Sequence, residues 1–183
     1  MQEFREAREV KEGSVLAVVA PSGPFAVEVF EQGVAWLRER YEVRYDAGVF
    51  ERSGYLAGSD GRRLAELRAA VEDDEVDVIV CARGGYGATR IVGGMEVAAV
   101  AAANKLVVGF SDVTALHGLW ARAGVRSVHG KMVADLGRAD AGQRERWVEV
   151  VEGRGGGRSW EVETVFPGDF EGRLFGGNLA LLV

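Results

Sequence analysis

Cysteine is almost absent from this chain of 183 residues, since Cys81 is the only one. A lone cysteine excludes an internal disulfide and any metal site built from several cysteines, which fits a reducing compartment. Histidine is nearly as rare, with His117 and His129 alone, and no cluster of residues has the spacing of metal ligands. We therefore expect no bound metal, and we interpret Cys81 as a small buried residue rather than a nucleophile.

Long apolar runs and an excess of basic charge are also missing. The longest apolar runs, VLAVVA at 15–20 and VAAVAAA at 97–103, are far shorter than the roughly 20 residues that span a bilayer. The N-terminus, MQEFREAREVKEG, is charged and lacks the apolar stretch of a secretory signal. The 22 basic and 28 acidic residues are scattered and give a net charge of −6. We expect a soluble, cytoplasmic protein that binds neither nucleic acid nor membranes.

What the sequence does contain is an alternation of short β-branched runs and helical patterns. Strands are predicted at 15–20, 41–46, 76–82 and 105–110. Helices are predicted at 25–40, at 59–73, over a stretch ending at about Asn104, and at 112–124. Four such alternations predict an α/β fold: a parallel sheet with helices on both faces, of the flavodoxin-like or class I glutamine amidotransferase-like type.

The last part of the chain has a weaker pattern. A helix is predicted at 144–153, a turn or linker at 153–157 and a strand at 159–166. With 48% hydrophobic residues, the chain can bury one good core but is short for two complete domains. Because it ends within the apolar segment FEGRLFGGNLALLV, we expect truncation. Residues 1–155 are assigned to an N-terminal α/β domain and residues 156–183 to the crossover and start of an incomplete second domain.

The segment GFSDV places Ser111 directly after a predicted strand and before a predicted helix. That arrangement is typical of a nucleophile elbow, in which a tight turn lifts the hydroxyl above the sheet and the next backbone N–H faces an oxyanion. GFSDV lacks the second glycine of the usual GxSxG pattern. On these residues alone, the alternative that Ser111 or Asp112 merely caps the following helix is favoured about two to one.

The segment RGGYG, at 83–87, follows the neighbouring predicted strand. Ligands bind at the carboxyl ends of the strands in parallel sheets, and both RGGYG and GFSDV lie at such ends. Paired glycines allow backbone N–H groups to approach a ligand closely, so the segment is a candidate wall of an oxyanion hole beside Ser111. The alternative is an ordinary glycine-rich turn. A phosphate loop is disfavoured, because the lysine of a P-loop is missing.

Neither histidine is a convincing partner for Ser111. His117 lies six residues further along a predicted helix, which corresponds to a rotation of about 240° and a rise of about 9 Å. A general base must come within about 3 Å of the hydroxyl, so His117 is interpreted as structural. His129 follows another apolar run and has about one chance in five of being the base.

Six segments together resemble the LD-carboxypeptidases, serine peptidase group S66, which include murein tetrapeptide carboxypeptidases and microcin C immunity peptidases. The segments occur in the family's order across nearly all of the chain: VAPSGP, YLAGSDGRRLAEL, VDVIVCARGGYGATRI, KLVVGFSDVTALH, VHG and GRLFGGNLALL. One departure is Lys131, because the family usually has proline after the His-Gly pair. The match is to the N-terminal part of the family.

The resemblance implies roles for individual residues. Ser111 is the nucleophile, and the backbone N–H groups of Gly85 and Asp112 form the oxyanion hole. The substrate-binding candidates are Arg83, Gly84, Tyr86 and Asn178. The family's base, a histidine oriented by a glutamate, lies downstream in a C-terminal domain, so neither His117 nor His129 corresponds to it. The 183-residue chain alone is therefore expected to be inactive.

The implied reaction is hydrolysis of the amide before a C-terminal D-alanine in murein tetrapeptides, as in peptidoglycan recycling, and it needs no cofactor. The implied partner is a small peptide substrate, and the full-length protein is expected to be a homodimer. Two alternatives remain open. One is a microcin-C-type peptidyl-nucleotide amidase, and the other is a ligand-binding α/β domain that retains the elbow but does not hydrolyse.

Overall fold

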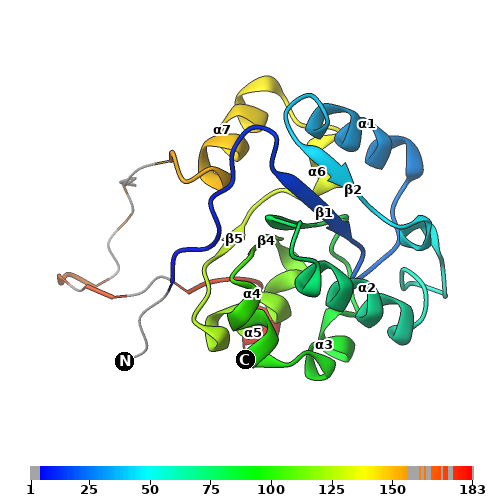
Figure 1. The fold of residues 1–183 in the computed structure, drawn as a ribbon. Helices are drawn as coiled ribbons and strands as arrows, with labels where there is room; N and C mark the ends of the chain where they lie inside the picture. The colour runs from blue at the N-terminus through cyan, green and yellow to red at the C-terminus, as the bar shows by residue number, and fades with distance from the viewer. Residues whose placement is uncertain are drawn as a thin grey trace.

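The computed structural model describes residues 5–155, 161, 163, 166–169, 171–172 and 175–182. Its centre is a five-stranded sheet with all strands parallel, in the order β2-β1-β3-β4-β5 (Figure 1). The strands are β1 (Val15–Val19), β2 (Glu42–Arg44), β3 (Val78–Cys81), β4 (Leu106–Gly109) and β5 (Ser127–His129). The predicted parallel sheet is confirmed. The sequence did not mark β5 as a strand, because SVH is too short to give a pattern.

Helices cover both faces of the sheet, as expected. The helices of one face are α1 (Val27–Leu37), α6 (Val133–Leu136) and α7 (Ala141–Val151). The other face carries α2 (Asp60–Glu72), α3 (Ala88–Ile91), α4 (Val97–Ala103) and α5 (Thr114–Ala123) (Figure 1). Successive residues of β1 alternate between the two cores, with Leu16 and Val18 in one and Ala17 and Val19 in the other. The central strands are therefore apolar throughout, since both of their faces are buried.

Two differences between the predicted and the observed helices have a clear physical reason. The stretch predicted to run to Asn104 is broken into α3, a 3-10 turn at Val92–Gly94, and α4, because Gly93 and Gly94 are poor helix formers. Asn104, in the left-handed conformation with φ 50°, ends α4. The helix predicted at 144–153 begins earlier, because the Asp140 side chain accepts a hydrogen bond from the Gln143 N–H.

The C-terminal part is described only in pieces. The turn predicted at 153–157 is described up to residue 155, whereas most of the strand predicted at 159–166 lies outside the described residues. A last short helix, α8 (Leu179–Leu182), contacts α5, and the Asn178 N–H donates to the Thr114 hydroxyl at 2.9 Å. Residues 178–182 thus lie beside the start of α5.

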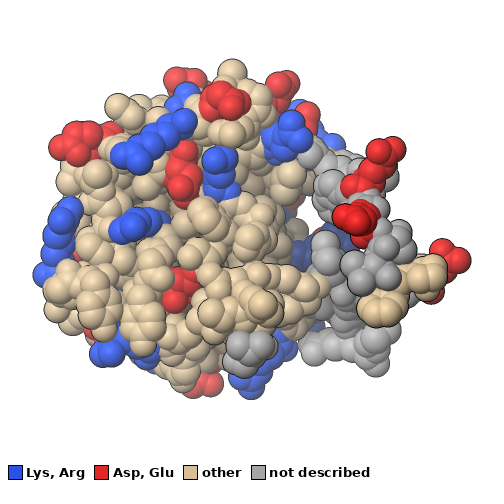
Figure 2. Space-filling model, turned by 180° about the vertical axis from the view of Figure 1, so that it is seen from behind, with Lys and Arg blue, Asp and Glu red and all other residues tan. Residues whose placement is uncertain are grey.

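On the face shown in Figure 2, Lys and Arg side chains lie among Asp and Glu side chains and form no single basic stripe. Within the described ranges, every helix is too short or too polar to cross a membrane.

Candidate active site

Ser111 occupies a sharp turn between β4 and α5. Phe110 is extended, with φ −150°, and Ser111 then takes φ 61° at the start of the 3-10 turn Ser111–Val113. A positive φ is uncommon for a residue with a side chain, and among the described residues only Asn104 shares it. Such strained backbones concentrate at functional sites. Ser111 therefore has the strand-turn-helix geometry of a nucleophile elbow.

The alternative that Asp112 caps the following helix is wrong. The residue at the N-terminal boundary of α5 is Val113, and no side chain there accepts a capping hydrogen bond. The Asp112 carboxylate instead accepts two hydrogen bonds through Oδ2, from the Ser22 hydroxyl at 2.6 Å and from the Ala88 N–H at 2.8 Å. Ser111 contributes its carbonyl, which accepts from the Thr114 hydroxyl at 2.7 Å.

The contacts of Asp112 connect three turns at the carboxyl ends of the strands. Ser22 follows β1, Ala88 follows the RGGYG segment after β3, and Asp112 follows β4. Both side chains are buried, with Ser22 0% and Asp112 3% exposed. A buried carboxylate is tolerated only where donors satisfy it. This network therefore holds the three turns in fixed positions around Ser111.

The RGGYG segment packs directly against Ser111. A Cβ atom added to Gly84 would lie 3.1 Å from the Ser111 Cβ and 3.3 Å from the Phe110 carbonyl oxygen. Gly85 follows with φ 119°, and the Gly84 carbonyl accepts from the Gly23 N–H at 3.0 Å. Within the described part of the chain, the N–H groups of Gly85 and Asp112 have no hydrogen-bond acceptor. Two free amides thus flank the serine, an arrangement that is able to bind an oxygen with negative charge.

The remaining candidate residues lie around this centre. Arg83 is exposed and donates from Nη1 to the Pro24 carbonyl at 2.5 Å. Tyr86 is 49% exposed, and its ring centroid lies 5.7 Å from that of Tyr55. Asn178 lies beside Thr114, as described above, and its side chain accepts from the Ala180 N–H at 3.0 Å. Arg83 and Tyr86 thus flank the Gly84–Gly85 pair in the chain, and Asn178 lies at the start of α5.

The two histidines are placed differently from each other. His117 is buried, with Nε2 2.9 Å from the Gly109 carbonyl and Nδ1 2.9 Å from the Ser127 hydroxyl. Burial lowers its pKa, so the neutral ring donates to the carbonyl and accepts from the hydroxyl. This confirms that His117 is structural. His129, at the end of β5, is exposed, and its ring lies 5.8 Å from that of His117.

Ser22 is the residue that the sequence interpretation missed. The signal was present, because the PSGP turn follows the first strand and therefore lies at the same sheet edge as Ser111. Cys81 is fully buried beneath this edge, and burial raises the pKa of its thiol, which confirms the expected structural role. The described ranges contain no group of three or more His, Cys, Asp or Glu residues that could hold a metal ion.

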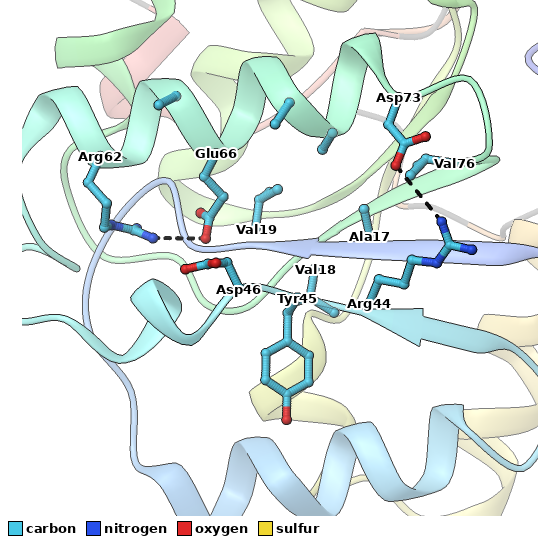
Figure 3. A pocket seen from close by; sticks show the side chains of 13 residues that line it. Ala17, Val18, Val19, Arg44, Tyr45, Asp46, Arg62, Glu66, Asp73 and Val76 are labelled. Carbon is cyan, nitrogen blue, oxygen red and sulfur yellow. Dashed lines mark hydrogen bonds and ion pairs between the residues drawn. The ribbon is translucent and has the colours of Figure 1, made fainter.

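A separate cavity of about 510 Å³ lies between α2 and β2, and we call it the α2–β2 groove (Figure 3). Its charged lining residues are Arg44, Asp46, Arg62, Glu66 and Asp73. Arg62 pairs with Glu66 at 2.8 Å, and Arg44 lies 3.9 Å from Asp73. Burial raises the pKa of Glu66, whose Oε2 accepts from the Ala20 N–H at 2.6 Å. No residue of the Ser111 turn or of RGGYG lines this groove.

Known proteins resemble this chain over most of its length. The family model of the LD-carboxypeptidase N-terminal domain, peptidase group S66, matches residues 16–130. The chain is 33% identical over 184 residues to a probable murein peptide carboxypeptidase of Bacillus subtilis, covering 96% of this chain and 57% of that protein. It is 32% identical over 180 residues to the murein tetrapeptide carboxypeptidase of Pseudomonas aeruginosa, covering 91% and 58%.

A similar fold occurs in a solved structure of the microcin C7 self-immunity protein MccF in complex with aspartyl sulfamoyl adenosine. The TM-score is 0.74 at 19% identity, covering 84% of this chain and 48% of the MccF chain. The chain thus spans about half to three fifths of the length of these proteins. Because the family model matches more than half of its residues, the chain belongs to the LD-carboxypeptidase family of serine peptidases.

Proposed function

We propose that this chain supplies the nucleophile and oxyanion-binding half of an LD-carboxypeptidase that removes the C-terminal D-alanine from murein tetrapeptides. The observation that carries the proposal is Ser111 at φ 61°, packed against Gly84 and flanked by the free amides of Gly85 and Asp112. The hydroxyl attacks the amide carbonyl, and the two N–H groups stabilise the resulting oxyanion. Arg83, Tyr86 and Asn178 contact the peptide around this centre.

The proton of Ser111 needs an acceptor other than the two histidines of this chain. Both ring nitrogens of His117 are engaged by Gly109 and Ser127, and no hydrogen bond joins His129 to Ser111 within the described ranges. By resemblance to the family, the acceptor is a histidine oriented by a glutamate in the C-terminal part, to which residues 156–183 lead. That histidine takes the proton and then transfers it to the leaving amine. We propose that the complete enzyme is cytoplasmic and homodimeric.

The murein substrate is favoured over a microcin-type peptidyl nucleotide by sequence similarity. The two murein carboxypeptidases are 33% and 32% identical to this chain, whereas the microcin immunity protein is 19% identical. The immunity protein therefore supports the fold, and the carboxypeptidases support the reaction.

The test is release of D-alanine from an L-Ala, D-Glu, diaminopimelate, D-Ala tetrapeptide by the full-length protein and its Ser111→Ala variant. We expect kcat to fall by about 10³-fold or more, because the nucleophile is lost. Ser53→Ala is the matched control, since Ser53 is exposed and lies outside the three turns around Ser111. Equal rates for wild type and Ser111→Ala would remove the nucleophile assignment. Cleavage of a peptidyl nucleotide in place of the tetrapeptide would favour the microcin-type reaction.

A further inference from the structure

A second cavity, of about 610 Å³, opens beside the RGGYG turn and has an unusual set of charges. Its cationic lining residues are Arg52, Arg83, Lys131 and Arg138, and we call it the cationic groove. One acid, Asp135, also lines it. The four cations come from separate segments of a chain whose net charge is −6. The groove therefore has an excess of positive charge, although the chain as a whole is net negative.

None of the four cations forms an ion pair with a described Asp or Glu residue. In the α2–β2 groove, by contrast, Arg44 and Arg62 both have carboxylate partners (Figure 3). Four like charges in one cavity repel one another, so they favour a ligand that brings negative charge. Asp135 offsets only part of this charge, and its Oδ2 accepts from the Met132 N–H at 3.3 Å.

Two of the guanidinium groups are held in place by backbone carbonyls. Arg83 donates to the Pro24 carbonyl and Arg52 donates to the Phe25 carbonyl at 2.9 Å. A guanidinium has five N–H donors, so each arginine keeps several for a ligand. The Lys131 carbonyl accepts from the Trp147 indole N–H at 2.9 Å, which fixes the backbone that carries its ammonium group. The groove is thus partly organised before a ligand binds, which reduces the entropy lost on binding.

The groove adjoins the candidate active site. Arg83 immediately precedes Gly84, which packs against Ser111, and Pro24 follows Gly23, which donates to the Gly84 carbonyl. A peptide with its scissile carbonyl at Ser111 therefore has the groove within reach of its neighbouring groups. A murein tetrapeptide of the composition given above carries three carboxylates, one each on D-Glu, diaminopimelate and D-Ala. One cation would serve the terminal carboxylate alone, whereas this groove supplies four.

We propose that the cationic groove binds the carboxylates of the acidic peptide substrate, with Arg83 nearest to the reacting end and Lys131 and Arg138 holding a carboxylate further along the peptide. This inference rests on the proposed function and identifies which part of the site selects an acidic peptide. Lys131 stands where the family usually has proline, so its charge is a feature of this chain rather than of the family pattern. The groove favours acidic tetrapeptides over forms whose D-Glu and diaminopimelate carboxylates are amidated.

The experiment measures binding by calorimetry to full-length protein carrying Ser111→Ala, so that the peptide is not consumed. The probes are the acidic tetrapeptide and the same peptide with the D-Glu and diaminopimelate carboxylates amidated. Adding Lys131→Gln and Arg138→Gln together is expected to weaken binding of the acidic peptide about tenfold. The double substitution should leave the affinity for the amidated peptide unchanged, and it should reduce the salt dependence of binding of the acidic peptide. Arg122→Gln, an exposed cation on α5 outside the groove, is the matched control.

Unchanged affinity of the double variant for the acidic peptide overturns the inference, as does equal affinity of the unaltered groove for both peptides. Tight binding of adenosine monophosphate that is lost in the double variant, without an effect on the tetrapeptide, also overturns it and assigns the groove to a phosphate. Arg138→Gln alone, at an exposed side chain, provides a variant that retains the fold and is expected to lose about threefold in affinity. If Ser111→Ala still released D-alanine, the proposed reaction would fail while these binding results stood.

Discussion

Asp112, in the turn after β4, and Glu66, on α2, are two enclosed acids whose hydrogen bonds are satisfied in different ways. Each accepts a backbone N–H at the carboxyl end of a strand or in the turn that follows it: Asp112 from Ala88, and Glu66 from Ala20. The second donor to Asp112 is the neutral hydroxyl of Ser22, whereas the second donor to Glu66 is the guanidinium of Arg62. The first acid lies beside Ser111, and the second lies in the α2–β2 groove (Figure 3).

The two regions differ in whether their charged side chains are paired within the protein. In the α2–β2 groove, acids and bases neutralise one another, so the groove has little charge left for a ligand. Around Ser111, neutral donors satisfy the acid, and the nearby cation Arg83 has only a carbonyl partner among the described residues. Charges satisfied internally contribute to structure, whereas those left unpaired at a rim remain available for a ligand. Substitutions that affect one region and spare the other test this distinction.

The largest expected effect is at Asp112. Asp112→Ala removes the acceptor of both Ser22 and Ala88, and two buried donors without partners should lower the free energy of unfolding by about 2–4 kcal/mol. Asp112→Asn should cost less than about 1 kcal/mol, because both donors use the same oxygen, Oδ2, which the amide retains. Urea unfolding of the three proteins measures the difference.

The amide substitution at the second acid, Glu66→Gln, is compared with Asp112→Asn. Glu66 uses Oε2 for Ala20 and Oε1 for Arg62, so Glu66→Gln directs an NH2 group toward a donor. Asp112→Asn should therefore lower the free energy of unfolding less than Glu66→Gln does. The comparison is made at acidic pH, where Glu66 has partly lost its charge, so that the hydrogen bonds rather than the charge decide the result. Asp112→Asn as destabilising as Asp112→Ala would show that charge, rather than the acceptor, holds the three turns.

A smaller effect is expected from one methyl group at Gly84. In Gly84→Ala the new Cβ meets the Ser111 Cβ at 3.1 Å and the Phe110 carbonyl at 3.3 Å, so the elbow must shift by a few tenths of an ångström. We expect kcat for D-alanine release by the full-length protein to fall about tenfold, since catalytic geometry is sensitive to such shifts. Steady-state kinetics with the tetrapeptide measures it.

Gly61→Ala on α2 is the matched control in the other region. Its nearest atom outside the neighbouring residues is the Ser59 hydroxyl at 3.9 Å, so the methyl group enters open space. Alanine in a helix should raise stability by a few tenths of a kcal/mol and leave kcat unchanged. Equal losses of kcat in both variants would mean that the packing of Gly84 on Ser111 has no part in catalysis.

The sequence predicted what local patterns encode. Apolar runs located four of the five strands. The GFSDV segment alone favoured a helix cap, and only the resemblance of six segments to the family assigned Ser111 to an elbow. The Ser22–Asp112 hydrogen bond joins residues 90 positions apart, so no local pattern reports it. The cationic groove likewise combines four cations that only the folded chain brings together, and of these the sequence interpretation assigned only Arg83 to substrate binding. Interactions between distant residues therefore account for most of what the sequence interpretation missed.

The smallest expected effect is a pH dependence at Glu66. Because burial raises its pKa above the usual 4.5, the unfolded chain releases the Glu66 proton at a lower pH than the folded chain does. Glu66 therefore destabilises the fold progressively as pH rises from about 4 toward 7, and Glu66→Gln lacks this loss. Relative to wild type, the glutamine variant should be more stable at about pH 7 than at about pH 4, as measured by urea unfolding at both pH values. A constant difference between Glu66→Gln and wild type would show that Arg62 and the Ala20 N–H offset the burial of this carboxylate completely.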